Sequence, residues 1–160
     1  MEGKKAQPRA ILVFGAPCSG KTTFSEKFSA KFNAPFYNIN DIEKEYDFDR
    51  ETTLKILDLI AKTHQNVVIE GGLDTEQERD TIRKIFKKAG YDPSLVWIQT
   101  DINTIKNRLK NKLRSVAKAK TEYDERMSKI EAPTELENAI VLSGKHTFTT
   151  QLTHVLSQLA

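Results

Sequence analysis

Several residue types that define whole classes of protein are scarce in this chain of 160 residues. Cys18 is its single cysteine, which excludes an internal disulfide and a metal site built from cysteines. None of the three histidines stands in a recognisable catalytic pattern. The longest apolar run, residues 10–14, is far shorter than the roughly 20 residues that a membrane-spanning helix needs, and no signal peptide is visible. We therefore expect a cytoplasmic protein without a membrane partner.

The charges of the chain nearly balance, and a formal net charge of +3 is too small to indicate a nucleic-acid partner by itself. Their distribution is uneven, because residues 106–120 hold seven cations and no acid. Such a run is typical of a solvated helix face. No aromatic residue interrupts it, whereas surfaces that stack the bases of single-stranded nucleic acid carry aromatic side chains. The run leaves a nucleic-acid partner open without favouring it.

Short apolar runs alternate with amphipathic segments along the chain. The runs expected to form strands are residues 10–14, 34–39, 66–72, 94–100 and 138–142. Strands that are separated by helices need crossover connections, so this pattern predicts a parallel sheet with helices on both faces. No linker or internal repeat divides the chain, and we expect a single domain over residues 1–160.

The segments between the strands carry recognisable helix boundaries. Asp49 is placed to cap one helix. Thr75 and Glu78 form a capping box for the next, which Gly90 ends. Trp97 lies within the fourth strand and is expected in the core. Sheets of this kind bind ligands beyond the carboxyl ends of their strands, so the residues that follow each strand are the functional candidates.

The first strand runs into a glycine-rich loop, GAPCSGKTT, which fits the pattern G-x-x-x-x-G-K-[ST] without a gap. In this pattern successive backbone N–H groups cradle phosphate oxygens at the N-terminus of a helix. Lys21 is expected to reach the β- and γ-phosphates, and the Thr22 hydroxyl to bind Mg²⁺. The motif therefore predicts a bound nucleotide with Mg²⁺. The predicted nucleotide-binding residues are Gly15, Ala16, Pro17, Cys18, Ser19, Gly20, Lys21, Thr22 and Thr23.

Acidic residues follow the second and third strands. Asp41 is placed to accept a proton from an acceptor hydroxyl that faces the γ-phosphate, and its alternative role is the N-cap of a short helix. Glu70 is placed to hold Mg²⁺ through water, and its alternative role is an ion pair with a neighbouring lysine. Gly71 and Gly72 indicate a close approach of the backbone to a ligand or a loop. The pattern leaves both roles of each acid open.

These motifs resemble those of small P-loop kinases of the adenylate-kinase-like branch, and more closely the AAA_33-type, polynucleotide-kinase-like and zeta-toxin-like ATP-binding proteins. GAPCSGKTTF matches the family loop GxPxSGKSTF, FYNIND resembles a second strand that ends in an acidic base, and LDTEQER has Arg79 at the family's arginine position. The resemblance covers nearly the whole chain. It implies an α/β protein with the three-layer P-loop NTPase fold, a five-stranded parallel sheet, helices on both faces, and a small helical lid at about residues 108–132.

The resemblance also gives the basic run a function. TDINTIKNRLKNKLR is similar to the helix that enters the lid, and Arg108 and Arg114 match lid arginines that contact ATP phosphates. ERMSKIEAPTELENAIVLSG is similar to the exit from the lid, with its E-x-P motif at Glu131 and Pro133. Adenine would lie between the lid helix and residues 143–146. The catalytic candidates are then Lys21, Asp41, Arg108 and Arg114, the metal-binding candidates are Thr22 and Glu70, and the implied cofactors are ATP and Mg²⁺.

Two departures from the family pattern concern the acceptor. Lys44 stands where the family has an arginine, and lysine cannot offer the same bidentate fork. Only residues 41–66 separate the second and third strands, where such kinases commonly carry a larger acceptor-binding subdomain. The main prediction is an ATP-dependent kinase that moves the γ-phosphoryl group to a hydroxyl or phosphate of a small molecule. The alternatives are a nucleotide-binding regulator or slow ATPase without acceptor chemistry, and a nucleic-acid 5′-hydroxyl kinase.

Overall fold

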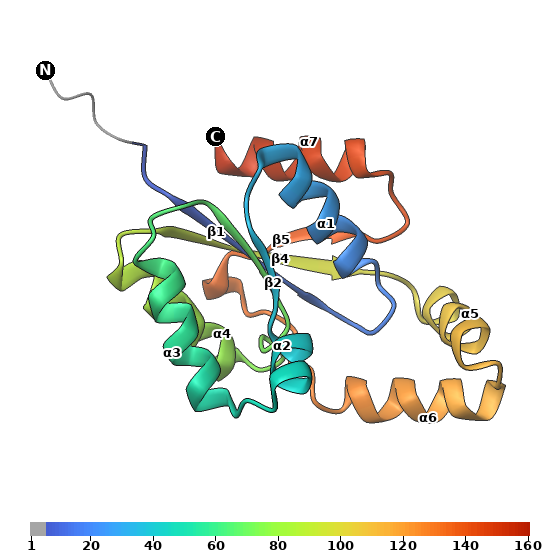
Figure 1. Ribbon diagram of the computed structural model, residues 1–160. Coiled ribbons are helices and arrows are strands. Elements are labelled where there is room, and N and C mark those ends of the chain that lie inside the picture. The colour runs from blue at the N-terminus through green and yellow to red at the C-terminus, as the bar shows by residue number, and fades with distance from the viewer. Residues whose placement is uncertain (1–5) are drawn as a thin grey trace, which may run out of the picture.

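A parallel sheet of five strands lies at the centre of the computed structural model, which describes residues 6–160 (Figure 1). The strands are β1 (Arg9–Gly15), β2 (Phe36–Asn38), β3 (Val67–Glu70), β4 (Asp92–Gln99) and β5 (Ile140–Ser143). Their order is β2-β3-β1-β4-β5, and every neighbouring pair is parallel. The predicted α/β class with a five-stranded parallel sheet is confirmed.

Helices cover both faces of this sheet. They are α1 (Lys21–Phe32), α2 (Ile39–Tyr46), α3 (Arg50–Ala61), α4 (Glu76–Lys88), α5 (Ile102–Leu113), α6 (Val116–Met127) and α7 (Phe148–Leu159), with a short 3-10 helix, η1 (Glu135–Glu137). Helices α1 and α7 lie on one face and α3 and α4 on the other (Figure 1). Within residues 6–160, no helix is long and apolar enough to cross a membrane.

The helix boundaries follow the capping residues. Asp49 accepts a hydrogen bond from the Thr52 N–H at 2.8 Å, and Thr75 and Glu78 form the complete capping box, as predicted. Ser115 caps α6 by accepting a hydrogen bond from the Lys118 N–H at 3.2 Å. Side-chain oxygens that satisfy the first free N–H groups of a helix thus fix where three of these helices begin.

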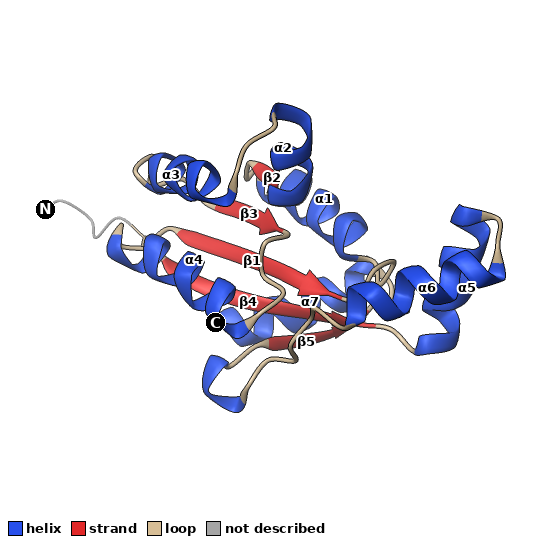
Figure 2. Ribbon diagram, turned by 90° about the horizontal axis from the view of Figure 1, so that it is seen from below, coloured by secondary structure: helices blue, strands red, loops and turns tan. Residues whose placement is uncertain are grey.

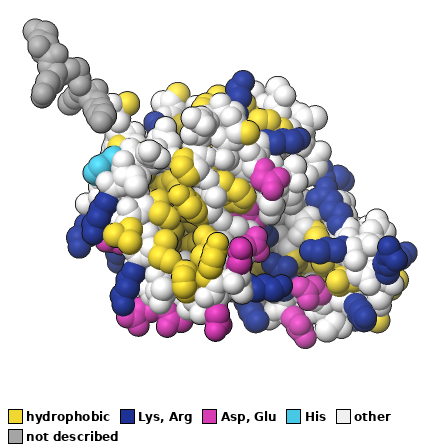
Figure 3. Space-filling view, viewed as in Figure 1, with side chains coloured by type: hydrophobic (Ala, Val, Ile, Leu, Met, Phe, Trp, Pro, Cys, Tyr) yellow, Lys and Arg dark blue, Asp and Glu magenta, His cyan; other side chains and the backbone are white. Residues whose placement is uncertain are grey.

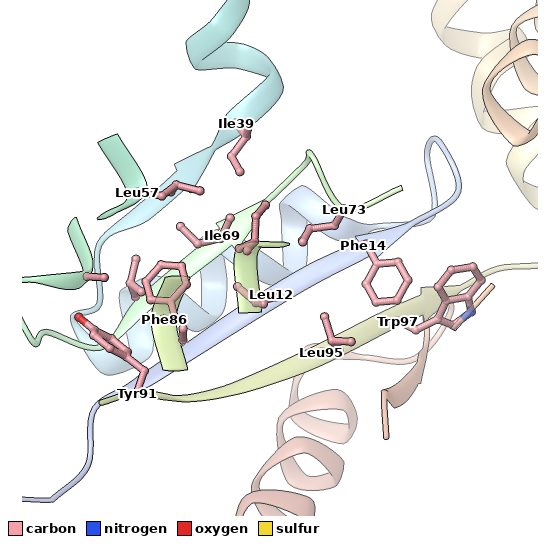
Figure 4. Packing of buried hydrophobic residues seen from close by; sticks show 14 residues of the cluster. Leu12, Phe14, Ile39, Leu57, Ile69, Leu73, Phe86, Tyr91, Leu95 and Trp97 are labelled. Atoms are coloured by element: carbon pink, nitrogen blue, oxygen red, sulfur yellow. The ribbon is translucent and has the colours of Figure 1, made fainter. Parts of the chain in front are cut away.

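The core consists of two layers, because successive residues of a strand point to opposite faces of the sheet. Leu12 and Phe14 of β1 face the layer of α3 and α4, where Figure 4 shows them among Ile69, Phe86 and other buried side chains. The intervening residues of β1 face α1 and α7. Trp97 is 8% exposed and packs edge-on against Phe14, with ring centroids 4.8 Å apart, so its predicted core position is confirmed.

Helices α5 and α6 form a hairpin beside the sheet, called here the lid hairpin (residues 102–127). A small core of its own, which includes Ile105, Leu109 and Ala119, holds the hairpin together and reaches Ala16 of the glycine-rich loop. Figure 2 shows that the strands point their carboxyl ends toward this hairpin. The lid hairpin therefore borders the edge of the sheet at which ligands of such folds bind.

Candidate functional site

The glycine-rich loop takes the conformation of a phosphate cradle between β1 and α1. Cys18 and Gly20 have positive φ angles of 54° and 103°, which turn the chain sharply before α1 begins. A Cβ on Gly15 would overlap the Ile98 carbonyl oxygen of β4, so only glycine fits there. The Ser19 side chain is fully buried, and its Oγ has no hydrogen-bond partner within residues 6–160. The loop thus leaves polar groups to be satisfied at the N-terminus of a helix, where anions are favoured.

Lys21 is folded onto this loop. Its ammonium donates hydrogen bonds to the carbonyl oxygens of Gly15 at 2.9 Å and Ala16 at 2.7 Å. Burial lowers the pKa of Lys21 from 10.5 to about 8, and the nearby negative charge of Glu70 only partly opposes this effect. The ammonium would gain its full electrostatic stabilisation only from added negative charge, such as a polyphosphate.

Thr22 in the first turn of α1 contacts Glu70 at the end of β3. The Thr22 hydroxyl donates a hydrogen bond of 2.8 Å to Glu70 Oε1. Glu70 is 3% exposed, and burial raises its carboxyl pKa although the Thr22 hydrogen bond and the Lys21 charge act against this. Its Oε2 has no partner within residues 6–160. The ion pair with a lysine, the alternative role of Glu70, is not formed among the described residues.

A hydroxyl beside a buried carboxylate with a free oxygen is a donor set that fits Mg²⁺. No group of three or more His, Cys, Asp or Glu side chains in residues 6–160 could hold a metal ion by itself. Phosphate oxygens and water would have to supply the remaining ligands, as Mg²⁺ prefers at nucleotide sites. The residues present therefore fit a metal that arrives with a nucleotide.

Two carboxylates from neighbouring strand ends line the same cleft. Asp41 lies in the first turn of α2, and its N–H donates to the side chain of Asn38, which is the true N-cap of this helix. The capping alternative for Asp41 is therefore wrong, and its exposed carboxylate lines the cleft. Asp74, which the sequence analysis missed, lines the cleft from the loop between β3 and α4. Burial first, and then the charge of Glu78, raise the pKa of the Asp74 carboxyl.

The turn after β3 explains how Asp74 reaches the cleft. Gly71 and Gly72 have φ angles of 83° and 65°, which few other residues adopt. A Cβ on Gly71 would lie 3.0 Å from the side-chain Nδ2 of Asn40 and 3.2 Å from its backbone nitrogen, so the first turn of α2 packs directly on this glycine. The close approach predicted for the glycine pair is to a neighbouring helix.

The lid hairpin contributes cations to the cleft, but Arg114, one of the two arginines expected there, is not among them. Arg108 donates to the Cys18 carbonyl oxygen at 2.9 Å, so its guanidinium lies on the glycine-rich loop. Arg114 is the C-cap residue of α5 with a φ of 54°, and it is exposed at the corner of the hairpin outside the cleft. The structure does not bring it to the other predicted residues. Arg126 and Lys129, at the end of α6 and just beyond it, line the cleft instead.

Arg126 lines the cleft and Arg114 does not because the chain reverses at the corner of the hairpin. The α5 helix ends at Leu113, and α6 then returns toward the sheet, which brings its last turn to the cleft. Arg126, Lys21 and Asp74 line the same cleft, and the positive charge of Arg126 acts to lower the pKa of both Lys21 and Asp74. Lysine and arginine side chains gather over the lid hairpin at the right of Figure 3.

The loop after β5 touches the glycine-rich loop from the other side. The Gly144 N–H donates to the Gln99 carbonyl oxygen at 2.7 Å, and a Cβ on Gly144 would overlap the Ser19 carbonyl oxygen. Thr100 also donates to that oxygen, at 3.0 Å. Gly144 and His146 line the cleft, which is consistent with the adenine position that the family resemblance implies.

Arg79, at the family's arginine position, lies in the core. Its side chain is fully buried, and it forms an ion pair with Glu137 at 2.6 Å. It also donates to the Glu131 carbonyl oxygen at 2.9 Å and lies over the Phe14 ring, 4.6 Å from the centroid. This arginine fastens the exit of the lid hairpin to the loop after β3, and it does not reach the cleft.

The cleft encloses ≈ 890 Å³ along the carboxyl edge of the sheet. It brings together the glycine-rich loop, Thr22 with Glu70, Asp41 with Asp74, and four cations from the lid hairpin and its exit, Arg108, Lys112, Arg126 and Lys129. That volume is within the range of small-molecule sites. The cleft thus combines a glycine-rich loop at a helix N-terminus with carboxylates on one side and cations from the lid hairpin.

Solved structures share this arrangement of elements. A gluconokinase from Sinorhizobium meliloti gives a TM-score of 0.69 at 15% identity, over 97% of this chain and 93% of that one. APS kinase from Mycobacterium tuberculosis, in complex with AMPPNP and APS, gives 0.71 at 15% identity, over 96% and 98% of the two chains. Shikimate kinase from Aquifex aeolicus gives 0.55 at 19% identity, over 94% and 95%. At these identities the likeness establishes the fold, which is that of small P-loop kinases.

Sequence comparison is less informative. No protein-family model matches the chain. Fidgetin-like protein 1 from Drosophila melanogaster is 32% identical over 69 residues, which are 42% of this chain and 13% of that protein. The chain thus corresponds to a small part of that relative's length. A segment of this size does not define a family.

Proposed function

We propose that this protein is an ATP- and Mg²⁺-dependent phosphotransferase that moves the γ-phosphoryl group to a hydroxyl group of a small-molecule acceptor. The observation that carries the proposal is the meeting of Lys21, the Thr22–Glu70 pair and Asp41 in one cleft. The kinase fold of the solved neighbours supports it.

Each part of the cleft has a task in this proposal. The backbone of residues 15–20 and the Lys21 ammonium bind the polyphosphate, and Lys21 leaves the two carbonyl oxygens that it contacts in the free protein. Thr22 and Glu70 hold Mg²⁺, which neutralises charge on the phosphate oxygens when it is bound. Asp41 accepts the proton of the attacking hydroxyl.

The lid cations complete the site. Arg108 and Arg126 approach from two helices of one hairpin, so closure of the hairpin would bring both to the transferred group and exclude water. Donors placed where negative charge develops are worth more than those that merely bind the ground state. We propose Arg126 for the role that the resemblance gave to Arg114, because Arg126 lines the cleft.

One observation favours the second candidate, a nucleotide-binding regulator or slow ATPase. Between β2 and β3 there are two helices, and α3 buries Leu57 and Ala61 in the sheet's core. Within this segment, only α2 therefore offers surface to an acceptor. A regulator would show nucleotide binding without transfer to any acceptor.

Lys21→Ala tests the assignment of the cleft. Binding of ATP with Mg²⁺ is measured by calorimetry, and transfer from γ-labelled ATP is followed on a panel of hydroxyl compounds. Lys31→Ala, an exposed lysine in the last turn of α1, is the matched control. We expect Lys21→Ala to lose most of the affinity or turnover and the control to retain both. Equal binding and equal turnover in wild type and Lys21→Ala would contradict the proposal.

A further inference from the structure

The cleft has two ends, which lie on opposite sides of β1. Asp41 and Asp74 line it beside α2 and the loop after β3, whereas the loop after β5 and the start of α7 line its other end. β2 and β5 are the two edge strands of the sheet, and Figure 2 shows α2 and β5 at its opposite edges. Because the proposed role of Asp41 places the γ-phosphate at the first end, the nucleobase extends toward the second. This nucleobase end is lined by Gly144, His146, Thr147, Phe148 and Gln151.

Gln151, near the start of α7, is held in one orientation. The residue is 7% exposed, and its Nε2 donates a hydrogen bond of 2.8 Å to the Ser143 carbonyl oxygen. A carbonyl oxygen can only accept hydrogen bonds, so the amide turns its NH₂ group toward Ser143 and its own oxygen away. Within residues 6–160 the Oε1 atom accepts no hydrogen bond, and it is not fully buried. Gln151 thus offers the nucleobase end an acceptor whose orientation is fixed.

A fixed acceptor distinguishes the purines. Adenine carries an amino group at position 6, which donates hydrogen bonds, whereas guanine and hypoxanthine carry an oxygen there, which accepts them. A glutamine whose amide is free to rotate by 180° can match either group, because its NH₂ and oxygen exchange places. Gln151 cannot rotate in this way without setting its oxygen against the Ser143 carbonyl oxygen. Two acceptors that face each other leave both unsatisfied, which costs free energy in a buried position.

The lysines of the cleft do not make this distinction. Lys27 of α1 and Lys112 of α5 also line the cleft, and both are exposed. An exposed ammonium on a flexible stem binds any nearby acceptor, and the N7 atom and the phosphates are common to all purine nucleotides. Such cations raise the affinity for every nucleotide, whereas a buried group in one orientation favours one base over another.

We propose that Gln151 makes the site selective for adenine nucleotides over guanine and hypoxanthine nucleotides, because its Oε1 accepts a hydrogen bond from the 6-amino group. The inference rests on the proposed function, which requires a nucleotide triphosphate at this site. Gln151 is then a residue that determines specificity for the phosphoryl donor, and it takes no part in the transfer itself.

The test compares nucleotides that differ at position 6 of the purine. Binding of ATP, ITP, GTP and purine riboside triphosphate, each with Mg²⁺, is measured by calorimetry on the full chain. ITP replaces the amino group by oxygen, and the purine riboside compound lacks any group there. We expect ATP to bind about tenfold more tightly than ITP and GTP, and severalfold more tightly than purine riboside triphosphate.

Gln151→Met removes the fixed acceptor and keeps the length of the side chain. The ratio of ATP to ITP affinity should fall to about one in this variant. Its fold should persist, because the Ser143 carbonyl oxygen also accepts a hydrogen bond from the His146 N–H at 3.2 Å. Gln158→Met, an exposed glutamine of the same helix outside the cleft, is the matched control and should keep the wild-type ratio.

Equal binding of ATP and ITP by the wild type, or tighter binding of GTP, would overturn the inference without any variant. An unchanged ratio in Gln151→Met would show that another group selects the base. Failure of the proposed function has a different result. If the protein binds none of the four nucleotides, both proposals are wrong, whereas selective ATP binding without transfer to any acceptor would contradict the kinase alone.

Discussion

Thr22 and Glu70 are 48 residues apart in the chain, yet the threonine hydroxyl donates a hydrogen bond of 2.8 Å to the buried glutamate. The contact joins the first turn of α1 to the end of β3, two elements whose adjacency follows from the order β3-β1 in the sheet. This hydrogen bond holds the two proposed Mg²⁺ ligands next to each other before any metal is bound. Ligands that are positioned in advance lose less entropy on binding.

Glu70→Gln should weaken Mg²⁺-dependent nucleotide binding by about 10–100-fold, as loss of a group that orients the metal site typically does. The amide keeps the shape and the contact with Thr22 but removes the negative charge. Calorimetry with ATP in the presence and absence of Mg²⁺ separates this effect from general loss of affinity. Glu26→Gln, an exposed position on α1, is the control. If Mg²⁺ enhances ATP binding equally in wild type and Glu70→Gln, Glu70 is not part of the metal site.

In alkaline solution, the protein should take up protons when it binds ATP. In the free protein the pKa of Lys21 is about 8, so above that pH a growing fraction of the side chain is neutral. Phosphate oxygens favour the ammonium and raise its pKa, which means that the complex binds a proton that the free protein has lost. Affinity should therefore fall as the pH rises above about 8.

Calorimetry at about pH 8.5 in two buffers with different ionisation enthalpies measures this uptake directly. The expected value is positive and below one proton per ATP, and Lys21→Met should abolish the part that Lys21 contributes. Proton uptake of equal size in Lys21→Met would assign the linkage to another group.

Substitution of the lid arginines should lower kcat by amounts that depend on whether each arginine lines the cleft. Arg108→Ala and Arg126→Ala are expected to lower kcat more than they weaken ATP binding, by about 2.7–4 kcal/mol for a donor that acts on developing charge. The family resemblance implies the same for Arg114→Ala, whereas the position of Arg114 outside the cleft predicts a smaller loss than that of Arg126→Ala. Steady-state kinetics of the three variants decide the order. A larger effect at Arg114 than at Arg126 would mean that the hairpin repacks on closure.

Asp41→Asn should leave ATP binding nearly intact, because the glycine-rich loop and the Thr22–Glu70 pair do not depend on this carboxylate. Transfer to an acceptor should fall by about 10²–10⁴, the usual contribution of a general base. Hydrolysis of ATP by water should fall less. The helix should also survive, since Asn38 and not Asp41 caps α2. Wild-type transfer by the asparagine variant would remove Asp41 from the chemistry and leave Asp74 as the carboxylate to test next.

The sequence predicted best what depends on local pattern. The glycine-rich loop, the capping residues and the continuous apolar strand residues 10–14 each encode their structure within a few positions. These features were sufficient to predict the parallel sheet and the glycine-rich loop that is expected to bind phosphate. The start of the second lid helix, α6, depends on the Ser115 cap, which the sequence analysis did not identify.

The residues that were missed depend on contacts across long distances in the chain. Asp74 is held in place by the Glu131 N–H, which donates to the Asp74 carbonyl oxygen at 2.8 Å across the whole lid hairpin. Arg126 reaches the cleft because α5 ends at Leu113, and no local signal fixes that length. Arg79 matched a family position, but its burial follows from a carboxylate, Glu137, that no spacing rule connects to it.

The ion pair between Arg79 and Glu137 has a consequence for the order in which the chain can fold. During synthesis Arg79 emerges 58 residues before its only carboxylate partner among the described ion pairs, with the entire lid hairpin in between. Until that partner arrives, burying the guanidinium on Phe14 would leave a charge without compensation, at a cost of several kcal/mol. Helix α4 is therefore expected to dock late, and such long-range closure slows folding. Because a late contact is absent from the transition state, Glu137→Gln should accelerate unfolding and leave the refolding rate almost unchanged. Stopped-flow fluorescence of Trp97, which packs on the same Phe14, would measure both rates.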